Sequence, residues 1–528
     1  MRNFQQPGRS EVMSTRAMVS TSHGLATSAA LEILQAGGNA FDAAIAGAAM
    51  LAVVEPTQTG IGGDCFALFK RKGQPVQALN GAGWAPAGAT LQYFKQRGVP
   101  QIDPYSADAI TVPGGIAAWY KLSQDHGKLS FKQLLQPAIL AAESGYPVTE
   151  RLARDWLRRK GQLLHCRYFN ETFYPNGEAP NPGEIHKQPL LAKALRSIAE
   201  EGADVFYKGW IAKDIVETMK TLGGTHNASD FEEYCPEYVK PIQVSYRGYQ
   251  LWECPPSGQG IVALAMAKIL ERYNLCELDP LGPERLHLHA EASRIAYAER
   301  DLFLCDPTHH PMPLDYLLSD ERASDLASRI KIDSRIEDLD VLPHTRHADT
   351  IYLSVVDEEG TAVSFINSIF DDFGSAILTS QSGIILHNRG SGFTLQEGHP
   401  NCIAGRKKPL HTIIPALLTK NDEVVMSFGV TGAHFQPMGQ VQILTNVVDY
   451  GMGIQEAIDA PRFFAFEDSF EVEESIPEET VLALRKLGHE VRRAQNPLGT
   501  AQAIWIDHRT GVLRAGADSR RDGCALGY

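Results

Sequence analysis

Alternation of polar and apolar residues is clearest just after residue 350. From Tyr352 to Val356, and again from Val363 to Ile366, apolar, aromatic and β-branched residues recur around a polar turn at 358–360. A period of two on both sides of a short polar turn predicts a β-hairpin. Thr350 would open its first strand, and on this pattern alone such a threonine is more often structural than chemical.

Helical spacing dominates the first half of the chain. Residues 28–36 carry apolar positions three and four apart and are followed by Gly37-Gly38, which predicts a left-handed helix end. Asn39 is then placed to cap a second helix. The apolar run 43–54, rich in Ala and Gly, is too short to cross a bilayer and predicts a buried helix.

Four further patterns complete the outline. Ser229–Glu232 has the form of a capping box, and residues 244–252 predict a hairpin that turns at Arg247-Gly248. Gly60–Gly63 lacks the strand-turn-helix setting of a nucleotide loop, so it predicts a close backbone approach. His287 and His289 lie two apart in a predicted helix and cannot share a face, so no metal pair is expected there.

Composition excludes several classes of function. The chain has 528 residues, 44% of them hydrophobic, and a formal net charge of −14. Phosphate neutralisation needs clustered Lys and Arg, so neither nucleic acid nor an anionic membrane is an expected partner. Residues 1–10 contain no apolar core of a secretory signal, which favours a cytoplasmic location. The eight cysteines form no Cys-x-x-Cys pair and are expected to be reduced; no metal or cofactor is predicted.

Several motifs occur in one order over nearly the whole chain, and together they resemble the γ-glutamyltransferase family of N-terminal-nucleophile hydrolases. The stretches that carry the resemblance are residues 31–44, 60–63, 111–115, 246–249, 349–368 and 518–523.

The resemblance implies a four-layer αββα fold of the α+β class. It also implies a precursor that cuts itself between Asp349 and Thr350, giving a large subunit (1–349) and a small subunit (350–528) that stay associated as one structural unit. The freed α-amine of Thr350 titrates near ~7.7 and can act as the base for the hydroxyl of the same residue. A dimer of processed heterodimers is a further expectation.

Three other residues take catalytic positions by the same resemblance. Ser368 matches a hydroxyl residue that hydrogen-bonds the nucleophile, and Gly432-Ala433 match the backbone turn that stabilises the tetrahedral oxyanion. The family has a second glycine where this chain has Ala433. Since the donor is a main-chain N–H, alanine can take this place if its φ is negative.

The substrate-binding positions depart from the pattern of true γ-glutamyltransferases. The arginine that grips the substrate α-carboxylate falls on Ala82, and the acid that holds the α-amine falls on Gly392. A cation, Arg389, replaces a glutamine, and the paired serines fall on His411 and Thr412. Loss of the acid leaves a substrate ammonium without a partner, which argues against γ-glutamyl recognition. Arg389 could instead be an ion-pair residue of the scaffold.

The patterns that begin at Asn367 and at His411 resemble an acylase-like subgroup of the family. Together with the exchanged contacts, they predict hydrolysis of a small anionic amide, best fitted by oxamate, with Arg389, His411, Thr412 and Asn367 as candidate contacts. Open alternatives are a γ-glutamyl hydrolase or transferase that uses glutathione, a glutaryl-type (cephalosporin) acylase, and a family member that has lost catalysis and serves as a scaffold.

Overall fold

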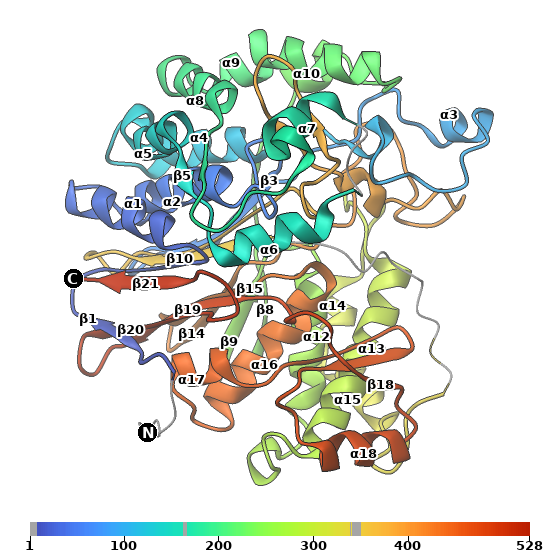
Figure 1. Cartoon of the computed structure of the whole chain (residues 1–528). Helices are drawn as coiled ribbons and strands as arrows, with labels where there is room; N and C mark the ends of the chain where they lie inside the picture. Colours follow the sequence, from blue (N-terminus) through green and yellow to red (C-terminus); the bar gives the residue numbers. More distant parts are fainter. Residues whose placement is uncertain (1–7, 162–165, 338, 340–349) are drawn as a thin grey trace.

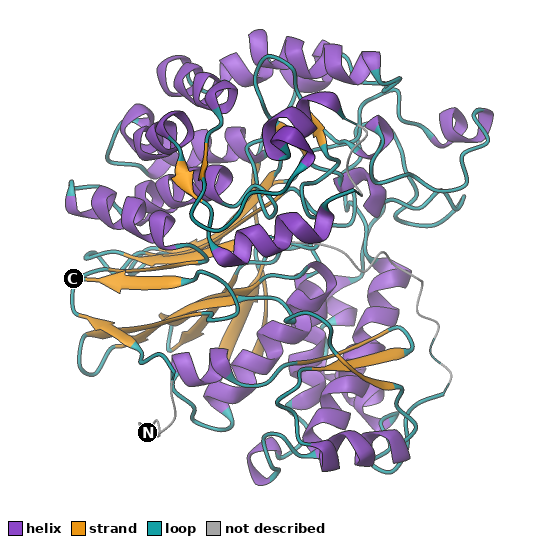
Figure 2. Ribbon diagram, in the orientation of Figure 1, coloured by secondary structure: helices purple, strands orange, loops and turns teal. Residues whose placement is uncertain are grey.

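Two antiparallel seven-stranded sheets lie face to face, with helices outside both of them (Figures 1 and 2). The structure is a computed structural model and describes residues 8–161, 166–337, 339 and 350–528. This arrangement is the predicted four-layer αββα architecture.

The sheet that contains β10 is called the β10 sheet. In spatial order its strands are β21 (Cys524–Gly527), β2 (Met18–Thr21), β10 (Ile351–Val356), β11 (Ala362–Ser368), β3 (Asp64–Lys70), β4 (Gln77–Gly81) and β7 (Glu237–Val239). The other, the β15 sheet, has the order β1 (Val12–Ser14), β20 (Val512–Ala517), β19 (Ala501–Asp507), β15 (Glu423–Val430), β14 (Ala416–Lys420), β9 (Tyr249–Glu253) and β8 (Ile242–Tyr246). Each sheet therefore combines strands from before and after residue 350.

Apolar helices cover the outer faces of the two sheets. Those packed on the β10 sheet or stacked on that layer are α1 (Gly24–Gln35), α2 (Ala40–Val54), α4 (Gly115–His126), α5 (Phe131–Ser144) and α8 (Pro189–Glu201). Those on the β15 side are α12 (Gly260–Leu270), α13 (Pro283–Phe303), α16 (Gln436–Val448) and α17 (Ile454–Asp459).

Further helices, 3₁₀ turns and small sheets lie outside these four layers. The remaining helices are α3 (Leu91–Gln96), α6 (Glu150–Arg159), α7 (Arg167–Phe173), α9 (Asp204–Tyr207), α10 (Trp210–Thr221), α11 (Ala228–Glu232), α14 (Leu314–Leu317), α15 (Asp320–Ser328) and α18 (Glu478–Lys486), with 3₁₀ turns at Ala107–Ala109, Pro175–Gly177, Leu275–Glu277, Arg389–Gly392 and Ala433–Phe435. The small sheets pair β5 (Tyr146–Pro147) with β6 (Ile185–His186), β12 (Ile377–Leu378) with β13 (Ile385–Leu386), and join β16 (Phe463–Phe466), β17 (Ser469–Val472) and β18 (Val491–Arg493).

The core has separate layers between the sheets and under the helices. Between the sheets, Phe66, Tyr352 and Ile366 meet Leu417 and Ile504 from the opposite sheet. Burying these apolar side chains stabilises the stack, because each fully buried side chain of this size contributes roughly 1.5–3 kcal/mol. Residues of the β10 sheet with the opposite parity point into the helical layer instead.

Most of the predicted elements are confirmed. Helix α1 ends where Gly37 takes a φ of 94°, and Asn39 caps α2 in a complete capping box. The two predicted hairpins are β10–β11 and β8–β9. The capping box predicted at Ser229–Glu232 is wrong by two residues, because the cap of α11 is Asn227.

The glycines at 60–63 make the close approach that the sequence predicts. A Cβ on Gly62 would lie 2.2 Å from the carbonyl oxygen of Ile385, and one on Gly63 would lie 2.2 Å from that of Ser368. Both distances are far below van der Waals contact, so a larger residue would push this segment away from β13 at Gly62 and from the end of β11 at Gly63.

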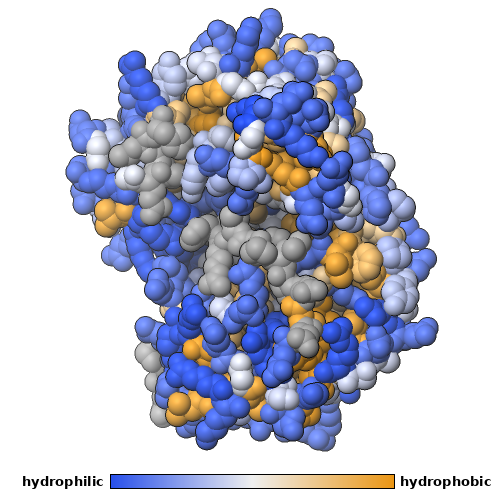
Figure 3. Space-filling model, turned by 90° about the vertical axis from the view of Figure 1, so that its right-hand side faces the viewer, coloured by the Kyte–Doolittle hydropathy of each residue, from blue (hydrophilic) through white to orange (hydrophobic). Residues whose placement is uncertain are grey.

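The face shown in Figure 3 is predominantly hydrophilic where it is described, with apolar side chains in several separate groups. Among the described residues, no helix combines the length and apolar character needed to cross a membrane.

Candidate functional site

Thr350 lies between the two sheets, at the start of β10. The register of β10 on β11 pairs Ile351 with Asn367, which brings Thr350 opposite Ser368, and Ser368 is paired with Asp64 of β3. Directly opposed residues of an antiparallel sheet share a face. The three side chains therefore form a row that points toward the β15 sheet, and Thr350 is almost completely buried.

Two polar side chains reach the Thr350 hydroxyl. Its Oγ1 lies 3.1 Å from Ser368 Oγ, as the sequence predicts, and 3.5 Å from Nε2 of Gln436 at the start of α16. The side-chain Oε1 of Gln436 accepts a hydrogen bond from the Ile414 N–H (3.1 Å), which fixes the orientation of the side-chain amide. Gln436 lies 86 residues from Thr350 in sequence, so no local pattern indicated it.

Arg389 is a fully buried cation beside this pair. Its Nη1 donates to Thr412 Oγ1 (2.8 Å) and its Nη2 donates to Ser368 Oγ (3.3 Å), while the guanidinium carbon lies 4.1 Å from the centre of the Phe370 ring. No carboxylate of the described residues forms an ion pair with it, and its Nε has no hydrogen-bond partner among them. Burial lowers the pKa of Arg389 to about 10, against the opposing charges of Asp64 and Asp371, so it remains cationic at neutral pH.

Asp64 is the buried acid whose charge acts most strongly on this cation, and both of its carboxylate oxygens accept hydrogen bonds. One carboxylate oxygen accepts from the N–H groups of Gly83 (3.1 Å) and Gly114 (3.0 Å), and the other accepts from His411 Nε2 (2.9 Å). Burial would raise the pKa of Asp64, but His387, His411 and Arg389 hold it at about 2.

His411 is therefore engaged by the protein. Burial, with the nearby Arg389 charge, lowers the pKa of His411 to about 3, so the imidazole is neutral. Its Nε2–H donates to Asp64, and its Nδ1 accepts a long hydrogen bond from the Ile413 N–H (3.4 Å). His411 therefore orients the carboxylate of Asp64. This role differs from the contact with substrate that the sequence suggests for His411.

Asn367 points away from Thr350. Strand alternation turns its side chain into the helical layer, where its Nδ2 donates to Thr59 Oγ1 (2.8 Å) and its Oδ1 accepts from Trp119 Nε1 (3.2 Å). The expected substrate contact by Asn367 is thus replaced by a structural role in holding the chain before β3 against β11.

The turn at Gly432-Ala433 follows β15 and precedes Gln436. Gly432 has a φ of 108°. Ala433 has a φ of 48°, so the negative φ required by the sequence argument is wrong. Neither N–H of this pair meets an acceptor among the described residues. An alanine in the left-handed region costs about 1–2 kcal/mol. The hydrogen bond that the Ala433 carbonyl accepts from Gln259 Nε2 (2.8 Å) helps to hold this conformation.

A cavity of about 470 Å³ is lined by Phe370, the residue whose ring contacts Arg389. Its lining includes Gly392, where the family has an acid, together with Arg300 and His434. A second cavity of about 280 Å³ is lined on one side by Gly432. Asp349, the other half of the predicted cleavage site, lies outside the described residues.

Comparison with known proteins shows which family the chain is similar to. The family model described as gamma-glutamyltranspeptidase matches residues 26–528. The chain belongs to the γ-glutamyltranspeptidase family. It is 37% identical to a glutathione hydrolase-like proenzyme, YwrD, of Bacillus subtilis (98% of this chain, 99% of the relative), and 35% identical to an oxamate amidohydrolase proenzyme of Klebsiella pneumoniae (98% and 99%).

The crystal structure of a cephalosporin acylase from Bacillus halodurans superposes with a TM-score of 0.93 at 38% identity, covering 100% of this chain and 99% of the other. The chain is thus an enzyme of the γ-glutamyltranspeptidase family with an N-terminal-nucleophile hydrolase fold, an amidohydrolase or acylase acting on amide C–N bonds.

Proposed function

We propose that the chain is a precursor that cleaves itself before Thr350 and then hydrolyses a small anionic amide, with oxamate as the best-fitting substrate. Fragments 1–349 and 350–528 would remain associated, since each contributes strands to both sheets. The observation that carries the choice of substrate is Arg389, a buried cation without a carboxylate partner beside the nucleophile.

Chemistry would begin at the freed α-amine of Thr350. It takes the hydroxyl proton while Oγ1 attacks the amide carbon, and the resulting oxyanion would be stabilised by the N–H groups of Gly432 and Ala433. Although Ala433 has a positive φ, neither N–H meets an acceptor among the described residues, so both remain available to the oxyanion. Collapse breaks the C–N bond as the ammonium returns the proton to the leaving nitrogen. Water, deprotonated by the same amine, then hydrolyses the ester and releases the acid.

Distances favour a short acyl group. Arg389 Nη2 and Thr350 Oγ1 both lie close to Ser368 Oγ, so they are at most about 6.4 Å apart. In oxamate the carboxylate carbon is one bond, about 1.5 Å, from the carbonyl carbon, whereas in an extended glutaryl group it is about 5 Å away. A glutaryl chain would have to fold back to reach both groups.

The arrangement also disfavours a substrate ammonium. Asp64 is already hydrogen-bonded by two backbone N–H groups and by His411, and Gly392 offers no side chain. An ammonium buried here without a carboxylate would lose its hydration uncompensated.

The test is release of ammonia or amine from purified enzyme, measured for oxamate, glutamine, glutathione and a glutaryl amide, with glycylglycine added to detect transfer. We expect oxamate to have the highest kcat/KM. A preference for glutathione or for the glutaryl amide would reject oxamate in favour of the corresponding alternative, and an uncleaved chain without turnover would identify a scaffold.

A further inference from the structure

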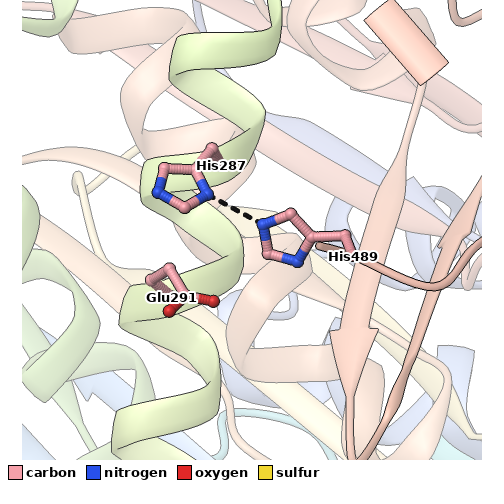
Figure 4. Close-up of side chains that lie close together, drawn as sticks. All are labelled: His287, Glu291 and His489. Atoms are coloured by element: carbon pink, nitrogen blue, oxygen red, sulfur yellow. Dashed lines mark hydrogen bonds between the residues drawn. The ribbon is translucent and has the colours of Figure 1, made fainter. Parts of the chain in front are cut away.

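Three ligating side chains meet far from Thr350 in sequence, on the β15 side of the molecule. His287 and Glu291 lie one turn apart on α13, and His489 reaches them from the segment between α18 and β18 (Figure 4). One ligating atom from each lies within 4.8 Å of the other two, and all three residues are buried. This cluster is the one place in the described part of the chain where three such groups have the spacing of a metal site.

The hydrogen bonds around His287 leave one of its nitrogens available as a ligand. A carbonyl oxygen can only accept, so the 2.7 Å contact between Nε2 and the Lys331 carbonyl places the proton on Nε2. Nδ1 is then an acceptor and faces Nε2 of His489 at 2.8 Å. An outer hydrogen bond from the second ring nitrogen to a backbone carbonyl is how proteins orient histidines that bind metal.

Glu291 is held in the same manner. One carboxylate oxygen accepts from Arg294 Nη1 (2.8 Å) and the other accepts from the Ile336 N–H (2.7 Å). Each oxygen retains a second lone pair for an ion. The charge of Arg294 opposes a further cation, so binding has to rely on the carboxylate together with both imidazoles.

His489 can present its Nε2 to an ion by a change of tautomer. In the structure, His489 donates its Nε2–H to His287. An ion bound between the rings needs that proton on Nδ1 instead, which is a tautomer change without net release of a proton.

We propose that His287 Nδ1, His489 Nε2 and the Glu291 carboxylate bind a divalent transition-metal ion of the zinc type. Two imidazoles and a carboxylate are a ligand set that zinc accepts, with a fourth position left for water. Tetrahedral ligands at 2.0–2.1 Å from zinc lie about 3.3 Å apart. The two nitrogens, now 2.8 Å apart, would separate slightly, and the carboxylate oxygen, within 4.8 Å of both, would take the same spacing.

Such an ion would join parts of the chain on both sides of Thr350. His287 and Glu291 precede it and His489 follows it, and the outer hydrogen bonds hold the segment 331–336. That the ion would link two separate polypeptides rests on the proposed cleavage. The far end of α13 carries Arg300, whose Nη1 donates to Gln259 and His434 beside the Ala433 turn, about 13 Å along the helix from Glu291.

The experiment uses full-length protein without a histidine tag, stripped with a chelator and then incubated with Zn²⁺. After desalting, elemental analysis should find about one zinc per chain, and Zn²⁺ should raise the Tm. Co²⁺ in place of Zn²⁺ should give the visible absorption of a tetrahedral site, a readout that needs no variant.

His489→Gln is the decisive variant, because glutamine keeps an N–H donor for His287 but is a poor zinc ligand. It should retain the hydrogen bond and lose both the zinc and the Tm shift. His310→Gln, at an exposed histidine, is the matched control and should bind zinc like the wild type. Equal zinc in wild type and His489→Gln, or no zinc in wild type, would overturn the proposal.

Thr350→Ala separates this inference from the proposed function. An uncleaved Thr350→Ala chain should still bind zinc, because all three ligands are present whether or not the backbone is cut. An inactive Thr350→Ala chain that binds zinc normally would support both proposals independently. A wild-type enzyme that is active but binds no zinc would overturn the metal site and leave the proposed function standing.

Discussion

Replacing Arg389 by alanine should selectively destroy recognition of an anionic amide. In the proposed complex the guanidinium exchanges its hydrogen bonds to neutral hydroxyls for one or two bonds to the substrate carboxylate. Charge-assisted hydrogen bonds contribute about 1.5–3 kcal/mol each. We therefore expect a loss of about 3–4 kcal/mol in binding of oxamate, or a 10²–10³-fold fall in kcat/KM.

Most of this loss should appear in KM. The carboxylate interacts with Arg389 in the ground state and in the transition state alike, so removing it takes away uniform binding. Self-cleavage involves no substrate carboxylate and should proceed. Ammonia release gives the kinetics, and gel electrophoresis gives the extent of cleavage.

The neutral analogue oxamide makes the assay sharper. It has the same reacting amide but no carboxylate, so its kcat/KM should change little in Arg389→Ala, and the ratio between the two substrates should collapse. Arg285 is a suitable control, since it is equally buried and bonded to neutral groups, away from Thr350. Arg285→Ala should lower stability without changing the ratio. An unchanged ratio in Arg389→Ala would refute the assignment of the anion site.

Three further changes test the remaining assignments. Thr350→Ala should leave a single uncut band and no turnover, whereas wild type should give two fragments that differ about twofold in length; a cleaved and active variant would disprove the nucleophile. Ala433→Gly should relieve the left-handed alanine and raise the free energy of unfolding by up to about 1–2 kcal/mol with activity retained, and a lower Tm would argue against strain there. Burial raises the pKa of Asp371 to about 6 from its ordinary 3.8, against a hydrogen bond from Asn388. The folded state then binds this proton more tightly than the unfolded state. The free energy of unfolding of the wild type, relative to that of Asp371→Asn, should therefore fall by at most about 3 kcal/mol as the pH rises from about 4 through 6. Urea unfolding of both proteins measures this difference, and a difference that does not change with pH would contradict the prediction.

Local patterns carried much of the fold because they depend on near neighbours in sequence. The β10–β11 hairpin, the Asn39 cap and the tight packing of Gly62 and Gly63 all follow from the alternation, capping and glycine signals that predicted them. The order of the fourteen strands in the two sheets has no such local signal and was not predicted; only the four-layer architecture followed from the resemblance to a family.

The site was only partly predictable for the same reason. Asp64 pairs with Ser368 across 304 residues of sequence, and Gln436 reaches Thr350 across 86. Asp64 did leave one signal, a charged residue at the start of a strand whose interior positions are apolar, where burial requires a partner. Asn367 could have been excluded as a substrate contact, because strand alternation opposes it to the face of Ser368. The φ of Ala433 is set by tertiary packing and could not be read from residue type.

Ser368 connects recognition of the substrate with activation of the nucleophile. Its Oγ accepts from the Phe370 N–H (2.9 Å) and from Arg389 Nη2 (3.3 Å). In the processed enzyme that we propose, Ser368 would donate its own proton to Thr350 Oγ1, 3.1 Å away, because these two donors occupy its lone pairs. The Thr350 proton would then face the α-amine that has to remove it. Arg389 would thus also help to orient the attacking hydroxyl, and a small fall in kcat for oxamide in Arg389→Ala would measure this second contribution separately from binding.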